Sequence, residues 1–189
     1  MNTKKPYNQA IKILLATSTV GSFIFGIFST FYVTYIQKIG GDIETAGSSL
    51  AVFSIVSGVL ILTFASVESS IKNKRLLYAA GLLLRSLAFL LFMFVSTFFE
   101  LLLVQILLGI SVAMVNPSFD SLFTKWSNKE DSISDWSGWE GFTAISIGVA
   151  SLVGGYVIQN FGFTVIFALM SLLSFSIGIF VLNIKDETL

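Results

Sequence analysis

Residues 136–183 read WSGWEGFTAISIGVASLVGGYVIQNFGFTVIFALMSLLSFSIGIFVLN, and Glu140 is the one charged residue in this stretch. A helix needs about 20 apolar residues to cross a hydrocarbon core about 30 Å thick, so the stretch is long enough for two crossings. The polar turn Asn160-Phe161-Gly162 divides it into the apolar segments 136–159 and 162–183. These residues therefore predict a transmembrane helical hairpin.

The rest of the chain repeats this pattern of long apolar runs and short polar breaks. Four further apolar runs precede the hairpin, at 9–37, 45–67, 75–97 and 99–124. The breaks between them are too short to hold a soluble domain. We therefore predict an all-α membrane protein in which residues 1–189 form one domain of six transmembrane helices.

Composition supports the membrane class and narrows the function. The chain is 54% hydrophobic and 12% charged, whereas soluble domains have about 25% charged residues. The 11 basic and 11 acidic residues cancel, so no nucleic-acid partner is indicated. Cys and His are absent, which removes thiol chemistry, imidazole bases and the usual zinc ligands. We expect no enzyme activity, no metal site and no cofactor.

The distribution of Lys and Arg predicts the orientation in the cell membrane. Cytoplasmic loops of membrane proteins are enriched in these residues. If the N-terminus is cytoplasmic, the outer face carries Lys38 alone. The inner face then carries the other cations near the span ends, which are Lys4, Lys5, Lys12, Lys72, Lys74, Arg75, Lys125, Lys129 and Lys185. Both termini are therefore predicted to be cytoplasmic.

Two of the predicted spans carry small residues at helical spacing. Small side chains let membrane helices approach closely, and this close packing holds them together where lipid is as apolar as Leu. One stripe, on 45–67, consists of Gly47, Ala51, Ser54 and Gly58, and the other, on 136–159, consists of Gly141, Ala144, Gly148, Ser151 and Gly155. The stripes either pack on each other within one bundle or form an interface with another bundle.

The segment 154–163, Gly-Gly-Tyr-Val-Ile-Gln-Asn-Phe-Gly-Phe, followed by Phe167, resembles the corner between the fifth and sixth helices of the major facilitator superfamily. The resemblance covers nearly the whole chain and is to the N-terminal half of that family. It implies one half of the family's fold, built from two inverted three-helix repeats. Glu68 and the basic residues 72–75 resemble the acid and the basic cluster that follow the family's second helix.

The resemblance implies a secondary transporter that moves a small solute by alternating access. Because a full-length member has two halves, a half-size chain is expected to work as a parallel C₂ homodimer. In the family the second and fifth helices meet across the halves, which would place the two stripes in the interface. The alternatives are one half of a heteromeric or split transporter, and a membrane assembly protein that transports nothing.

Arg85 is the cation that is most costly to place in the membrane. Ten residues separate it from Arg75 at the inner surface, which at about 1.5 Å per residue puts it about 15 Å deep. A charge there should face protein or a water-filled cavity. One hypothesis gives it an anion-binding or gating role, and the alternative is a structural hydrogen bond to carbonyl groups or to Gln105.

Other polar residues of the spans are candidates for the solute site. The first and fourth helices line the solute path in the family, which implies such a role for Ser22, Tyr32, Gln105 and Asn116. The alternative for Gln105 and Asn116 is a hydrogen bond between helices, and the hydroxyl of Ser22 can instead bond back to its own helix. Gln105 stands where many proton-coupled members of the family carry Arg, so the resemblance leaves the coupling ion open.

Charged residues near the cytoplasmic ends of the spans are candidates for a gate. By resemblance, Glu68 would contact the start of the partner's fifth span and hold the inner side closed. The remaining gating candidates are Asp120, Glu140, Lys72 and Arg75. The alternative is that these are ordinary charges at the membrane interface.

Overall fold

A computed structural model describes residues 8–67, 73–127 and 132–184, and every element in this part of the chain is a helix. The helices are α1 (Gln9–Lys38), α2 (Ile43–Val67), α3 (Lys74–Phe92), α4 (Phe98–Trp126) and α5 (Ser132–Asn183). Each is long and apolar enough to cross a membrane. The structure therefore confirms the prediction of an all-α protein built from membrane-length helices.

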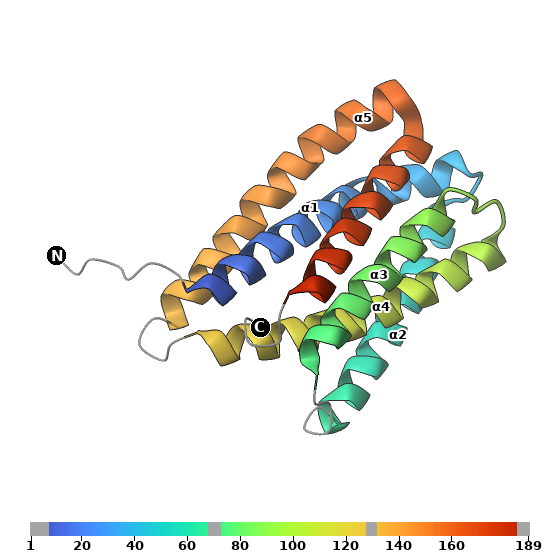
Figure 1. The fold of residues 1–189 in the computed structure, drawn as a ribbon. Coiled ribbons are helices and arrows are strands. Elements are labelled where there is room, and N and C mark those ends of the chain that lie inside the picture. The colour runs from blue at the N-terminus through green and yellow to red at the C-terminus, as the bar shows by residue number, and fades with distance from the viewer. Residues whose placement is uncertain (1–7, 68–72, 128–131, 185–189) are drawn as a thin grey trace.

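The last helix reverses its direction at Gly162. This residue has φ 82° and ψ 176°, a non-helical conformation inside α5 that is open almost only to glycine. In Figure 1 the orange part of α5 rises to this point and the red part returns beside α1 and α3. The described residues thus form five helices where six were predicted, because α5 includes the helical segments on both sides of this reversal.

The third predicted span, 75–97, is longer than the helix it describes. α3 ends at Phe92, and α4 begins at Phe98 behind a capping box. Thr97 accepts a hydrogen bond from the Glu100 backbone N–H at 3.3 Å, and the Glu100 carboxylate accepts one from the Thr97 N–H at 3.0 Å. The predicted span is therefore too long at its C-terminal end, because these paired hydrogen bonds already belong to the start of the next helix.

The helices form one bundle in which α5 packs on α1 and α3, and α4 packs on α3 and α2 (Figure 1). The start of α1 and the end of α5 lie at the same end of the bundle, which we call the terminal end. The opposite end carries the loops 39–42 and 93–97 together with Gly162, and we call it the far end.

An aromatic cluster fills the bundle near the far end. Tyr35 of α1 packs on Phe167 of α5 with ring centroids 4.8 Å apart, and Phe167 stacks on Phe92 of α3 at 5.2 Å. The Tyr35 hydroxyl also donates a hydrogen bond to the Phe92 carbonyl at 2.8 Å. These contacts join three helices through close aromatic packing at this end.

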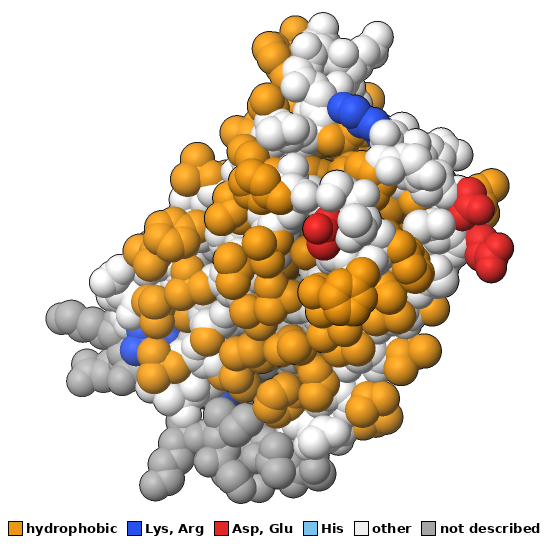
Figure 2. Space-filling view, turned by 90° about the vertical axis from the view of Figure 1, so that its right-hand side faces the viewer, with side chains coloured by type: hydrophobic (Ala, Val, Ile, Leu, Met, Phe, Trp, Pro, Cys, Tyr) orange, Lys and Arg blue, Asp and Glu red, His pale blue; other side chains and the backbone are white. Residues whose placement is uncertain are grey.

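The outside of the bundle is strongly apolar. Ile43, Leu62 and Leu152 are each at least 75% exposed. Figure 2 shows one such face, where hydrophobic side chains form a broad field and charged groups lie in its upper part and at its lower left. A surface of this kind suits contact with lipid and would be costly in water.

Candidate functional site: a cavity around Arg85

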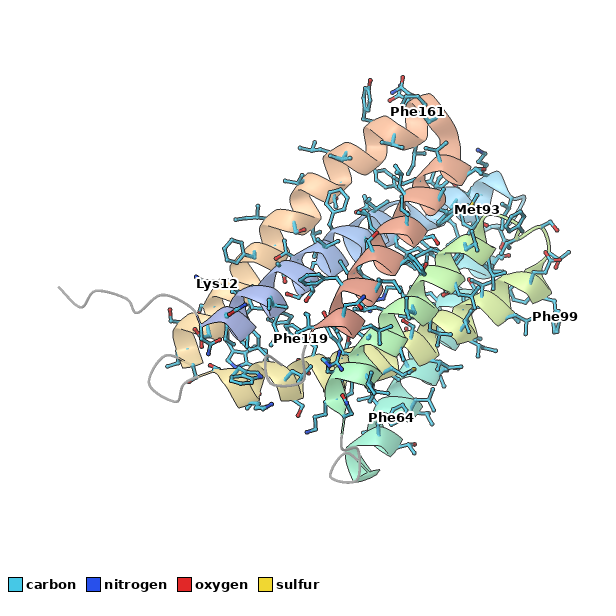
Figure 3. All side chains as sticks on the ribbon, viewed as in Figure 1. Lys12, Phe64, Met93, Phe99, Phe119 and Phe161 are labelled. Atoms are coloured by element: carbon cyan, nitrogen blue, oxygen red, sulfur yellow. The ribbon has the colours of Figure 1, made fainter. Side chains whose placement is uncertain are left out.

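A cavity of about 500 Å³ lies among the helices, between the aromatic cluster and the terminal end. All five helices contribute to its wall, through residues 18–25, 53–61, 78–85, 112–120 and 139–147. Phe119, labelled in Figure 3, belongs to this wall and lies toward the terminal end, whereas Met93 and Phe99 lie at the far end. The cavity is therefore displaced toward one end of the bundle.

Arg85 forms part of the cavity wall from α3, and its side chain is only 9% exposed. A Cβ added at Gly21 of α1 would lie 3.5 Å from its Nη1 atom, so the guanidinium extends to the α1 backbone. Within residues 8–67, 73–127 and 132–184, no hydrogen bond or ion pair reaches it, and its electrostatic neighbour is Tyr78. A cation at the centre of a bilayer costs at least about 2.5–3.5 kcal/mol, which the cavity reduces if it holds water.

Gln105 and Tyr32 lie outside the cavity. Gln105 is completely buried in α4, and its Nε2 atom donates a hydrogen bond to the Tyr32 hydroxyl at 2.5 Å. The Tyr32 oxygen is also 2.6 Å from the Ser49 hydroxyl of α2. The network joins α1, α2 and α4, and for Gln105 it corresponds to the alternative of a hydrogen bond between helices. Gln105 therefore does not bond to Arg85.

Ser22 and Asn116 lie where the solute hypothesis requires, in the wall of the cavity. The Ser22 hydroxyl is 3.3 Å from the Thr143 hydroxyl of α5, which also lines the cavity. Asn116 is exposed and precedes Pro117 within α4. Three of the five solute candidates, namely Arg85, Ser22 and Asn116, are thus brought together.

The gating candidates are dispersed. Asp120 lines the cavity, whereas Glu140 is exposed on α5 and does not. The Arg75 Nη1 atom donates to the carbonyls of Val181 and Leu182 at 3.0 and 2.5 Å, which ties the start of α3 to the end of α5. Glu68 and Lys72 lie outside the described residues.

The two small-residue stripes lie on the surface of the chain. An added Cβ would meet nothing within 4 Å at Gly47 or Gly58 of α2, or at Gly141 or Gly148 of α5. At the other end of the second stripe, Gly155 faces Phe31 of α1 at 3.4 Å. In the described part of the chain, α5 packs mainly on α1 and α3, and α2 mainly on α4 and α1. The stripes therefore do not pack on each other along their length.

Sequence reasoning missed the walls that α2 and α5 contribute. Phe53, Ser57 and Ile61 of α2 line the cavity, as do Trp139, Thr143 and Ile147 of α5. Each set recurs every four residues, which is the spacing of one helix face. This periodicity was a usable signal. It could not be recognised among the other residues because both spans are apolar on all sides.

A comparison with models of protein families identifies a family that matches this chain. The sequence model described as the Major Facilitator Superfamily matches residues 14–188. The match covers most of α1 and the whole of α2, α3, α4 and α5. A search of curated proteins found no match to the chain.

Proposed function

This chain belongs to the major facilitator superfamily, and on that premise we propose that it moves a small solute by alternating access. Membership makes it an integral membrane protein and a secondary transporter in general terms. The observation that carries the proposal is the cavity of about 500 Å³ with buried Arg85 in its wall. Solute sites of transporters lie near the bilayer midplane, which is the depth predicted for Arg85.

The proposed topology has six crossings arranged as two inverted three-helix repeats, with both termini in the cytoplasm. The reversal of α5 at Gly162 supports the fifth and sixth crossings. Among the described residues, Lys12, Lys74, Arg75 and Lys125 lie at the terminal end and Lys38 at the far end, which favours a cytoplasmic position for the terminal end. The cavity would then lie on the cytoplasmic side of the membrane centre.

We propose a homodimer because the stripes border the cavity. On α2, Ser54 and Gly58 directly follow the wall residues Phe53 and Ser57. On α5, Ala144 and Gly148 directly follow the wall residues Thr143 and Ile147. A second copy seated on both stripes would cover the cavity. A two-fold axis lets α2 of each copy meet α5 of the other, so that both contacts are made by one symmetric interface.

Uptake into proteoliposomes tests the transport proposal. Purified protein in liposomes would be offered labelled neutral, cationic and anionic small solutes, with protein-free liposomes as the control. We expect uptake of at least one class to exceed the control and to saturate. If folded protein takes up none of them, the alternative of a non-transporting assembly protein is favoured. A second polypeptide that copurifies in a fixed ratio would replace the homodimer by a heteromeric transporter.

A further inference from the structure

Arg85 presents a positive charge to the cavity without a counter-charge from the residues that the structure describes. It is about nine-tenths buried, and no hydrogen bond or ion pair reaches it within the ranges 8–67, 73–127 and 132–184. A structural arginine in a membrane is normally paired with an acid or with carbonyl oxygens. The free guanidinium can therefore accept a counter-charge from a bound molecule, and its planar donors suit a carboxylate or sulfonate.

The rest of the wall is largely aromatic and aliphatic. Its large apolar members include Phe25, Phe53, Phe119, Trp139, Ile61 and Leu82. Phe119 and Trp139 face each other with ring centroids 5.7 Å apart, so part of the wall is a continuous aromatic surface. Hydroxyl groups of Ser22 and Thr143 lie in the same cavity. A ligand that is complementary to this wall has a flat apolar body and a single negatively charged group.

Asp120, the other described charge in the wall, does not neutralise Arg85. Ser111 of α4 donates a hydrogen bond to the Gly81 carbonyl of α3 at 2.9 Å, which sets the two helices side by side. From this point the backbone of Asp120 lies about 13 Å toward the terminal end, and the backbone of Arg85 lies about 6 Å in the opposite direction. The two residues therefore start from opposite ends of the cavity wall, and the Asp120 side chain is engaged in an interaction that does not involve Arg85.

We propose that the cavity binds organic monoanions, namely carboxylates or sulfonates on a flat apolar body, and that Arg85 selects for their negative charge. The cavity volume of about 500 Å³ falls within the usual range for small-molecule sites. The proposal rests on the proposed transport function, because it names the class of solute that the same cavity would carry. Binding is tested separately from transport.

A charge series of one shape tests the selectivity. Binding of naphthoate, naphthamide and naphthylmethylammonium to the purified protein in detergent would be measured by isothermal titration calorimetry. We expect naphthoate to bind at least about tenfold more tightly than the neutral amide, and the cation to bind most weakly. Equal or tighter binding of the amide or the cation would overturn the proposal, as would failure of all three to bind.

Substitution assigns the selectivity to Arg85. Arg85→Gln should weaken naphthoate binding about 10- to 100-fold and leave naphthamide binding nearly unchanged. Arg85→Lys should retain part of the affinity. Lys12→Gln, which removes one positive charge from an exposed site at the start of α1, should bind like the wild type. Unchanged naphthoate binding by Arg85→Gln would refute the role of Arg85. If that variant does not fold, the charge series in the wild type still decides the ligand class.

Two further arms separate this proposal from neighbouring ones. An anionic phospholipid offers the same chemistry, a negative group on an apolar body. Displacement of naphthoate by phosphatidylglycerol but not by phosphatidylcholine would assign the site to lipid and overturn the proposal of a soluble organic anion.

Naphthoate binding that depends on Arg85, without uptake into proteoliposomes, would support the anion site and contradict transport. Uptake restricted to neutral or cationic solutes would support transport and contradict the anion site.

Discussion

Arg85 and Gln105 show how differently two polar residues of membrane helices can be placed. Both interrupt long apolar runs, and both were candidates for the solute site. Gln105 is fully buried and hydrogen-bonded to Tyr32, whereas Arg85 borders a cavity and has no partner in the described ranges. Their sequence neighbourhoods do not distinguish them, because the difference lies in what the neighbouring helices present at the same depth.

The Tyr32 hydroxyl should be more important for stability than for solute binding. Tyr32→Phe leaves the buried Gln105 Nε2 group without its acceptor, which we expect to lower the free energy of unfolding by about 1–3 kcal/mol. Tyr156→Phe is the matched control, because Tyr156 is 66% exposed on the surface of α5. Thermal unfolding in detergent measures both variants. Equal stability of the two would argue against the network.

Asp42 should contribute a pH-dependent stability at the start of α2. The backbone N–H and the hydroxyl of Thr45 donate to its carboxylate, which lowers the pKa of Asp42 below its usual value. Its contribution is therefore present above the unfolded-state pKa and is lost as the pH falls through the lower folded-state pKa. Below about pH 4 the melting temperature of the wild type should decline more steeply than that of Asp42→Asn. If the melting temperatures of the two proteins decline in parallel, Asp42 makes no such pH-dependent contribution.

At the scale of elements, the ends of the helices can be predicted from the sequence more accurately than the neighbours against which each helix packs. The chain reverses its direction at two places that the sequence marks, namely Lys38 to Asp42 and the Asn160-Phe161-Gly162 turn. Glycine and polar groups are energetically unfavourable inside a membrane helix, so their presence indicates a turn. The end of α3 was missed because residues 93–95 are as apolar as the helix before them. The Thr97-to-Glu100 capping box was a readable signal for the start of α4.

Gly162 should be essential for the hairpin within α5. Its backbone conformation costs any other residue about 1–3 kcal/mol, so Gly162→Ala should lower the free energy of unfolding by that amount. Ser176→Ala is the control, since Ser176 lies at an exposed helical position of α5 outside the small-residue stripe. Chemical unfolding followed by circular dichroism compares the two. A Gly162→Ala protein as stable as Ser176→Ala would show that the turn relaxes without strain.

At the scale of the molecule, the chain leaves two glycine-rich helix surfaces uncovered on the borders of its cavity. Their existence could be predicted from the spacing of small residues, since the pattern alone identifies a close-packing helix face. What they face could not be predicted, because the same spacing serves contacts within and between chains. The structure decides against the first possibility by packing α5 on α1 and α3, and α2 on α4.

Bulk on the α5 stripe should disrupt the proposed homodimer. Gly148→Trp fills the open space above the helix, so we expect a shift from dimer to monomer in detergent. Leu172→Trp, at a 60% exposed position elsewhere on α5, should leave the dimer intact. Size-exclusion chromatography with light scattering measures the mass of both. A Gly148→Trp protein that remains dimeric would remove this stripe from the interface.

The aromatic cluster of Tyr35, Phe92 and Phe167 determines from which side a water-soluble reagent can enter. It packs α1, α3 and α5 together between the cavity and the far end, so in the proposed homodimer access to the cavity is expected from the terminal end. Because the chain contains no Cys, one cysteine placed at Asn116 would be its only thiol. In oriented vesicles that thiol should react with a membrane-impermeant maleimide from one side and be protected from the other.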